Sequence, residues 1–198
     1  MRARLALVAA SIPVHLREVV LRDKPAAFLA ASPSGTVPCL VDGEVVIDES
    51  LDIMVWALER HDPRGLLDMP AVGWDLIAEC DGPFKQALDR TKYATRFPDA
   101  DPVAERSRAG AFLTQLDAQI ESHLFDRPTL ADAAILPFVR QFAFIDKRWF
   151  DAQEWPHLQR WLDRFLTSDA FATIMPKFPQ WQAGDPPVIF PKAPFQPM

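Results

Sequence analysis

The fold is decided by Ser34-Gly35-Thr36-Val37-Pro38-Cys39-Leu40 and, a few residues further along the chain, by Asp48-Glu49-Ser50. The first stretch is typical of a turn that enters a short strand, because proline has no N–H to donate and stands at strand starts, edges or bulges. A proline that turns its neighbour's backbone toward a ligand is often cis, as we expect for Pro38. The second stretch places an acid and a hydroxyl where a helical pattern begins, so free N–H groups and the helix dipole form an anion site. Together the two stretches can hold both ends of a small, extended, charged peptide.

The first sixty residues alternate between helical and extended patterns. Good helix formers, an alternating β-branched run and a turn signal at Asp42-Gly43 are the local evidence. The predicted elements are, in chain order, a helix at 3–10, a strand at 14–20, a short helix at 25–31, strands at 38–41 and 45–47, and a helix at 49–60. With one further strand in front, this order is βαβαββα, the thioredoxin-like plan.

Proline and glycine within residues 61–68 mark a linker, and the chain beyond it has a helical pattern. Helices are predicted at 72–95, 102–123, 130–145, 155–167 and 169–175. From Phe178 onward the chain is rich in proline, and we expect an extended segment that lies on the surface or is loosely ordered. The sequence therefore predicts an α/β domain at 1–61, a linker at 62–71, and an all-helical domain with a proline-rich tail at 72–198.

Composition and charge exclude several classes of protein. The 198 residues can bury a sizeable core, and 49% hydrophobic with 24% charged residues is typical of a soluble globular protein. The net charge of −6 and the lack of a basic stripe argue against nucleic-acid binding, and no apolar run is long enough to span a membrane. Cys39 and Cys80 form no disulfide framework, which favours a reducing cytoplasm. The histidines have no paired metal spacing, so no metal is expected.

Two further segments complete a recognisable pattern. They are Arg22-Asp23-Lys24-Pro25-Ala26-Ala27-Phe28-Leu29 and Pro128-Thr129-Leu130-Ala131-Asp132-Ala133-Ala134-Ile135-Leu136-Pro137. With the two opening stretches, in this order and spacing, the chain resembles the glutathione S-transferase superfamily, in particular its cysteine-type, omega-like bacterial members. The resemblance extends over nearly the whole chain and implies a thioredoxin-like α/β domain followed by an all-α domain. Thr129 and Asp132 have the form of a capping box, which is a structural role.

The resemblance implies a glutathione site made of Lys24, Val37, Pro38, Glu49 and Ser50. In the family, the residue before the cis proline pairs its backbone with the cysteine of glutathione as if the tripeptide were an added strand, and Val37 has that place. Glu49 and Ser50 would hold the ammonium and carboxylate of the γ-glutamyl end, and Lys24 would reach the glycine carboxylate. Each assignment has a structural alternative. Pro38 could be a plain strand-start proline, Asp48 or Ser50 could simply cap the helix, and Lys24 could be a solvated lysine.

The resemblance also implies a first strand and a catalytic loop ahead of the first helix, whereas residues 1–10 already have the pattern of that helix. The chain is therefore expected to lack the family's first strand and its catalytic Cys, Ser or Tyr. Either a start assigned too late or a natural variant without its nucleophile would explain this. No residue is assigned a catalytic role, and Arg2 and Arg4 could only attract an anion.

The missing strand would be central in a thioredoxin-like sheet. Its absence leaves buried backbone groups unpaired, each at a cost of roughly 1–3 kcal/mol. We therefore expect a poorly folded first domain for residues 1–198. A substitute strand, from Val188-Ile189-Phe190 in the tail or from a partner chain, is not expected.

Two cysteines and one tyrosine remain as candidates for chemistry. Cys39 should point away from a ligand bound at Val37, and Cys80 is expected to be an inert packing residue on the first long helix of the second domain. Tyr93, further along the same helix, could contact an electrophile, although packing is the alternative.

The family resemblance implies an enzyme, a glutathione transferase or glutathione-dependent thiol transferase. Glutathione would be its co-substrate, and a small hydrophobic electrophile or a disulfide its second substrate. The alternative is a non-catalytic binding or regulatory module with the same fold, and a glutathione-dependent isomerase or dehalogenase is not separable from the first hypothesis. A cytoplasmic homodimer is expected from the family. The sequence leaves open the electrophile, the oligomeric state and whether an intact nucleophile would be Cys, Ser or Tyr.

Overall fold

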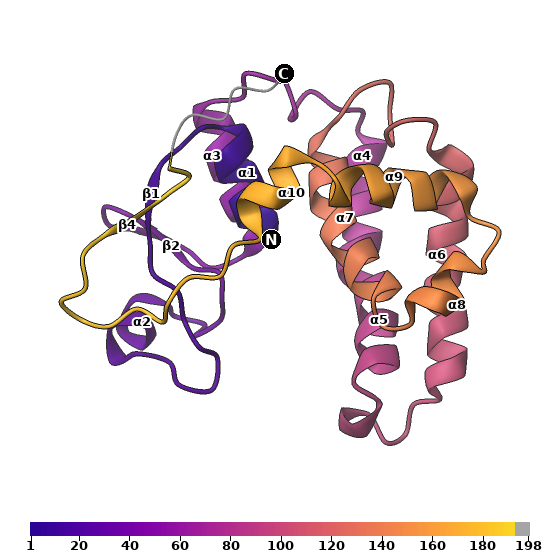
Figure 1. Ribbon diagram of the computed structural model, residues 1–198, viewed down its shortest axis with the longest axis horizontal. Helices are drawn as coiled ribbons and strands as arrows, with labels where there is room; N and C mark the ends of the chain where they lie inside the picture. The colour runs from indigo at the N-terminus through magenta and orange to yellow at the C-terminus, as the bar shows by residue number, and fades with distance from the viewer. Residues whose placement is uncertain (193–198) are drawn as a thin grey trace. The chain divides into compact units, whose positions relative to one another are not determined.

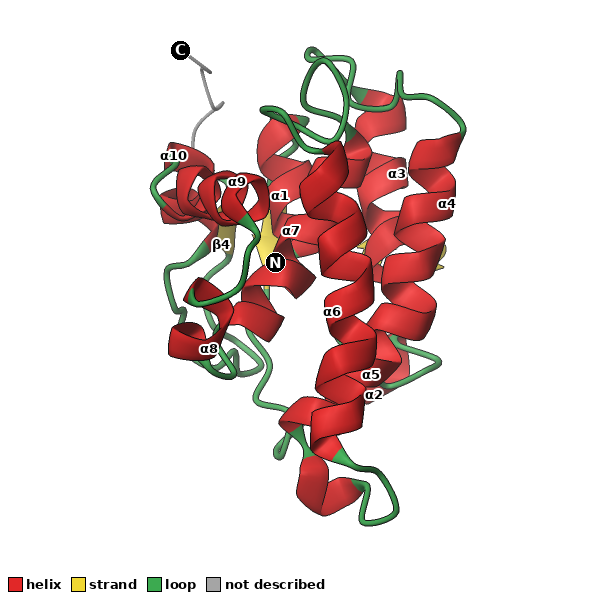
Figure 2. Ribbon diagram, turned by 90° about the vertical axis from the view of Figure 1, so that its right-hand side faces the viewer, coloured by secondary structure: helices red, strands yellow, loops and turns green. Residues whose placement is uncertain are grey.

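The computed structural model describes residues 1–192 (Figures 1 and 2). Residues 193–198, the end of the proline-rich tail, lie outside the described residues. The contacts within the chain group it into two units. The first unit is Met1–Leu67 together with the segment from Asp169 onward, and the second is Asp68–Ser168.

The first unit consists of short strands and helices. Its elements are α1 (Arg2–Ala9), β1 (Val14–Leu16), α2 (Ala26–Ala31), β2 (Leu40–Asp42), β3 (Val45–Ile47), α3 (Ser50–Arg60), α10 (Asp169–Ile174) and β4 (Val188–Phe190). Helix α1 packs against α3 and α10. Their facing side chains, among them Leu7, Val8, Ile53 and Met54, are buried and form the core of this unit. Burial of these apolar groups stabilises the helices far more than their intrinsic propensity does.

A hairpin connects β2 to β3 as the sequence predicts. The strands pair antiparallel, with Leu40 opposite Ile47 and Asp42 opposite Val45. Gly43 in the turn has a φ of 61°, a left-handed conformation that glycine adopts without steric cost. The hairpin positions the loop before β2 and the start of α3 at neighbouring points, because both flank the same strand pair.

The tail is where the structure corrects the sequence prediction. Strand β4 pairs antiparallel with β1, with Val14 opposite Phe190 and Leu16 opposite Val188. The tail was expected to be an extended or loosely ordered part of the helical domain, and residues 188–190 were not expected to supply a strand. Instead, the segment from Asp169 onward groups with the first unit. Strand β1 thus has a hydrogen-bonded partner, which weakens the argument that this domain must be poorly folded.

Strand β1 is also shorter than the predicted strand at 14–20. Beyond Leu16, Glu18 accepts a hydrogen bond from the Trp181 N–H at 2.9 Å and forms an isolated bridge with Gln180. Val20 pairs with Asp23 in a tight turn. The residues after Leu16 therefore do not form a regular strand ladder. They pair instead with the tail and within a local turn.

The second unit is helical. Its elements are α4 (Val72–Glu79), a π-helical segment η1 (Cys80–Phe84), α5 (Lys85–Lys92), a 3₁₀ turn η2 (Ala94–Arg96), α6 (Pro102–Gln119), α7 (Leu130–Ala143), α8 (Lys147–Asp151) and α9 (Pro156–Leu166). The single helix predicted at 72–95 is interrupted at η1, because Pro83 has no N–H for the regular helical bond. Helix α8 was not predicted, since five residues carry too little periodicity. Phe84 stacks with Phe112 and Phe142 inside this unit, at centroid distances of 5.0 and 5.8 Å.

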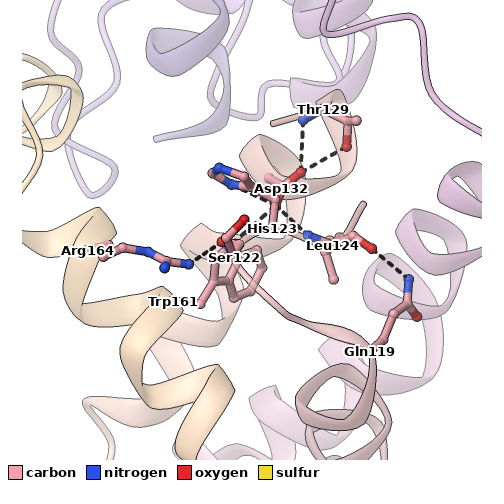
Figure 3. Close-up of polar contacts among 8 residues, drawn as sticks. All are labelled: Gln119, Ser122, His123, Leu124, Thr129, Asp132, Trp161 and Arg164. Atoms are coloured by element: carbon pink, nitrogen blue, oxygen red, sulfur yellow. Dashed lines mark hydrogen bonds and ion pairs between the residues drawn. The ribbon is translucent and has the colours of Figure 1, made fainter. Parts of the chain in front are cut away.

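The predicted capping box at Thr129 and Asp132 is present at the start of α7 (Figure 3). Thr129 donates to Asp132 Oδ2 from its N–H and from its hydroxyl, both at 2.9 Å. The same carboxylate also accepts from the Leu124 N–H at 3.0 Å and from Trp161 Nε1 at 3.2 Å, both through Oδ1. Asp132 therefore ties together the loop before α7, the start of α7 and helix α9, which is more than a cap.

Candidate functional site

The carboxylate of Asp48 joins the two stretches that open the sequence argument. Its Oδ2 accepts from the Ser34 N–H, and its Oδ1 accepts from the Ser32 hydroxyl, both at 3.0 Å. The Cys39 thiol also hydrogen-bonds to Asp48. Since Glu49 follows Asp48 directly and Val37 lies between Ser34 and Cys39, these contacts bring the predicted strand edge and the predicted helix start to one place.

Val37 has the geometry expected of a backbone that receives an extended ligand. The Val37–Pro38 peptide bond is cis, as predicted, and Val37 is 43% exposed. Neither the N–H nor the C=O of Val37 has a hydrogen-bond partner within residues 1–192. An exposed, unpaired backbone pair of this kind can accept an added strand.

The start of α3 is open. Glu49 is the N-cap and Ser50 the first helical residue, and no side chain caps the helix. The alternative of simple N-capping by Asp48 or Ser50 is therefore wrong, because Asp48 instead binds the loop at Ser32 and Ser34. In the described part of the chain, neither the Glu49 carboxylate nor the Ser50 hydroxyl has a partner. Free N–H groups, a hydroxyl and a carboxylate stand together there and can bind an ammonium and a carboxylate of one ligand.

Lys24 is fixed rather than simply solvated. Its Nζ donates to the Gly35 carbonyl at 2.9 Å, just ahead of α2. Gly35 has a φ of 63°, so the chain turns sharply two residues before Val37. An ammonium has three donors, and this bond uses one of them. The structure thus places Lys24 beside the loop that carries Val37.

Hydrogen bonds set the electrostatics at Asp48 and Cys39. The Ser34 N–H, followed by Cys39 and the serine hydroxyls, lowers the pKa of the Asp48 carboxyl below its ordinary value. Burial raises the pKa of the Cys39 thiol, and the neighbouring Asp48 carboxylate raises it further, against a smaller opposing effect of Ser32. Cys39 is therefore a protonated structural thiol at neutral pH.

Cys80 and Tyr93, the other candidates, lie in the second unit, Asp68–Ser168. Cys80 is fully buried in η1, which agrees with its predicted packing role. Tyr93 lies against two cations, with Lys92 Nζ 5.0 Å and Arg96 Cζ 4.6 Å from its ring centroid. Over residues 1–192, no cluster of His, Cys, Asp and Glu could hold a metal ion. A helix long and apolar enough to cross a membrane is likewise missing from that part of the chain.

Sequence reasoning missed the organising role of Ser32, Ser34 and Asp48. Asp48 was considered only as an N-cap, and Ser32 and Ser34 were not singled out. A signal does exist, because Ser32-Pro33-Ser34-Gly35-Thr36 is a run of small hydroxyl residues broken by proline and glycine. Such runs commonly form turns that bind carboxylates through their N–H and hydroxyl groups. Only the fold shows which carboxylate they bind.

The environment of Cys39 leads to a prediction on thiol reactivity. We expect the reaction of Cys39 with a disulfide reagent to have its rate–pH midpoint at a higher pH than the reaction of a free cysteine. The reason is that burial and the Asp48 charge both disfavour the thiolate. Asp48→Asn removes the negative charge, so the midpoint of the rate–pH profile should move down while burial keeps it above the free value. The measurement is stopped-flow labelling of the thiols. The Cys39→Ser variant gives the labelling of Cys80 alone, which is subtracted. An unchanged midpoint in Asp48→Asn would contradict the contact.

Solved structures with the same fold are glutathione transferases. One is a glutathione transferase family member from Pseudomonas fluorescens pf-5 with two glutathione bound, at a TM-score of 0.71 and 19% identity, covering 86% of this chain and 85% of that one. A bacterial zeta-class maleyl pyruvate isomerase has a TM-score of 0.66 and 25% identity, covering 86% and 89%. Glutathione transferase Omega 3C from Trametes versicolor has a TM-score of 0.71 and 18% identity, covering 85% and 76%. Omega-like proteins are therefore among the structural neighbours.

Sequence comparisons agree with the structural ones. Glutathione S-transferase aclG of Aspergillus oryzae is 41% identical over 58 residues, which is 28% of this chain, and the chain spans 25% of the length of that relative. Residues 1–65 match the family model of the glutathione S-transferase N-terminal domain, and residues 84–164 match that of the C-terminal domain. The two matches cover most of the chain, in the order that the fold has. The chain belongs to the glutathione S-transferase superfamily.

Proposed function

We propose that this protein binds glutathione as a co-substrate at Lys24, Val37, Pro38, Glu49 and Ser50. The observation that carries the proposal is the convergence of an unpaired, exposed backbone at Val37 with the uncapped start of α3, both held in place by Asp48. Family membership and the glutathione bound to the Pseudomonas relative support it.

The ligand would be held by the chemistry of each residue. Val37 would pair its N–H and C=O with the cysteine residue of glutathione, as in the addition of a strand. Glu49 would bind the γ-glutamyl ammonium, and the Ser50 hydroxyl with the first N–H groups of α3 would bind the adjacent carboxylate. Lys24 would give its remaining donors to the glycine carboxylate. Pro38 would direct the Val37 backbone outward.

The activity that fits this site is transfer of glutathione to a small hydrophobic electrophile, or thiol exchange with a small disulfide. The reacting sulfur would be that of glutathione, which loses its proton to solvent. It would then bond to the carbon of an aryl halide as the halide ion leaves, or to one disulfide sulfur as the other leaves as a thiolate. Cys80 is buried and Cys39 is held as a thiol, so neither suits the nucleophile's role. No residue of this sequence is proposed as that nucleophile.

A second candidate is a glutathione-binding or regulatory module without catalysis. The observation in its favour is the state of the two cysteines, because Cys80 is fully buried and the pKa of the Cys39 thiol is raised by burial and by Asp48. The two hypotheses separate by turnover. A transferase would consume an aryl halide or a small disulfide in the presence of glutathione, whereas a module would bind glutathione and turn over neither. The likeness to maleyl pyruvate isomerase makes a glutathione-dependent isomerisation the next reaction to assay.

A reducing cytoplasm and a homodimer are part of the proposal. Both cysteines are free, as a reducing compartment would leave them. A homodimer follows from family membership, and light scattering after size-exclusion chromatography would test it. A mass of one chain, 22.3 kDa, at working concentration would overturn the dimer.

Calorimetric titration of glutathione tests the binding site. We expect saturable binding that weakens at least tenfold, or about 1.4 kcal/mol, in Glu49→Gln, because the ammonium of the ligand loses its counter-charge. Ser50→Ala should weaken binding by a smaller factor. Glu44→Gln is the matched control, since Glu44 is an exposed carboxylate in the turn after β2 and should leave binding unchanged. Equal affinities of Glu49→Gln and Glu44→Gln would sink this assignment.

A further inference from the structure

A pocket in the first unit shares no residue with the candidate glutathione site. It lies between the end of β1 and the tail segment that precedes β4, and its volume is about 300 Å³. Residues 15–17 of the β1 end and Trp181, Asp185 and Pro187 of the tail line it. This volume is at the lower end of pockets that bind small molecules, so it fits a ligand of one or two rings.

Arg17 supplies the pocket with an available cation. Its guanidinium carbon lies 4.6 Å from the centroid of the Trp181 ring, so the cation is in cation–π contact with the ring. Within residues 1–192, Arg17 has no hydrogen bond and no ion pair. A guanidinium that uses its face on an aromatic ring keeps its N–H edge free for a carboxylate. The imidazole of His15, which also lines the pocket, likewise has no hydrogen-bond partner among residues 1–192.

The tail residues that line the pocket are already ordered. The backbone N–H of Trp181 donates to the Glu18 carbonyl at 2.9 Å, which fixes the main chain of Trp181 beside the end of β1. The Gln182 N–H donates to Asp185 Oδ2 at 2.7 Å, and the Asp185 N–H donates to the Gln182 carbonyl at 3.1 Å. A ligand would therefore enter a site that needs little reorganisation, which lowers the entropic cost of binding.

The chemistry of the walls selects the ligand. Trp181, Leu16 and Pro187 offer apolar surface to a flat body, and Arg17 offers a fork for one carboxylate. The Asp185 carboxylate opposes a second negative charge. We propose that this pocket binds a small aromatic molecule that carries a single carboxylate. The proposal does not depend on glutathione binding, because the two sets of residues are separate.

Titration with 1-naphthoate tests the proposal, and neutral 1-naphthamide is the matched ligand. The readout is the indole N–H resonance of Trp181 in ¹⁵N-labelled protein, assigned by its loss in Trp181→Phe. We expect naphthoate to shift this resonance in a saturable way and naphthamide to bind at least tenfold more weakly. Arg17→Met keeps the length of the side chain and removes its charge, so naphthoate should also bind at least tenfold more weakly to this variant.

Arg22→Met is the control variant, because Arg22 is an exposed arginine outside the pocket. It should bind naphthoate as the unaltered protein does. If the melting temperature of Arg17→Met is unchanged, weaker binding by this variant reflects the lost charge and not a lost fold. If the melting temperature is lowered, the comparison of naphthoate with naphthamide on the unaltered protein tests the proposal instead. Equal binding of naphthoate and naphthamide, or a Trp181 resonance that does not respond, would overturn the proposal.

Discussion

Replacing Asp132 by alanine is expected to lower the free energy of unfolding of the unit Asp68–Ser168 by about 4 kcal/mol. The Asp132 side chain is 7% exposed and accepts four hydrogen bonds, from the N–H and hydroxyl of Thr129, the Leu124 N–H and Trp161 Nε1 (Figure 3). Alanine leaves these donors buried without acceptors, and water cannot replace the carboxylate without opening the core. Urea unfolding followed by far-UV circular dichroism measures the loss.

The control for this change is Asp126→Ala, because Asp126 is an exposed carboxylate in the same loop and its removal should cost less than about 0.5 kcal/mol. Asp132→Asn is the second variant, in case the alanine variant does not fold. Asparagine keeps one acceptor but turns an NH₂ group toward donors, so an intermediate loss of about 2 kcal/mol is expected. If Asp132→Ala and Asp126→Ala unfold alike, the carboxylate does not hold these three segments together.

Arg4→Met is expected to destabilise the attachment of the tail to the first unit by about 2 kcal/mol. Arg4 Nη2 bonds Glu18 Oε2 at 2.6 Å, and Nη1 donates to the carbonyls of Ile174 and Pro176 at 3.1 and 3.3 Å. Its guanidinium also lies over two tail rings, at 5.2 Å from Phe178 and 5.6 Å from Phe190. The anion that Arg4 attracts is therefore the Glu18 carboxylate of the same unit, and the tail occupies the rest of the guanidinium.

Hydrogen exchange reports this effect where it occurs. The backbone N–H of Trp181, which donates to the Glu18 carbonyl, should exchange about 30-fold faster in Arg4→Met. This factor is equivalent to about 2 kcal/mol of lost protection. Buried amides of α3 should change less, because α3 does not rely on the tail. Arg22→Met, an exposed arginine of the same unit, should leave the Trp181 N–H unaffected. Equal exchange in both variants would show that Arg4 does not hold the tail.

Much of the candidate site was predictable because its signals are local. The cis bond before Pro38, the turn at Gly43 and the start of a helix after Glu49 each depend on residues a few positions apart. Proline and glycine restrict the backbone strongly, so such signals survive in almost any fold. The contacts of Lys24 with Gly35 and of Asp48 with Ser34 were not predictable in the same way. They join loops eleven and fourteen residues apart, and many polar partners compete for each carboxylate and ammonium.

By itself, the sequence determined the two-part plan, the hairpin, the helix start at Ser50 and the capping box at Thr129, because short runs encode turns, caps and periodicity. Only the tertiary structure decided that the tail pairs with β1. A three-residue run between prolines carries too little strand signal, and its pairing with β1 joins residues more than 170 positions apart. That choice rests on the burial of Phe190 and on the several contacts of Arg4, which exist only after α1, α10 and the tail have come together.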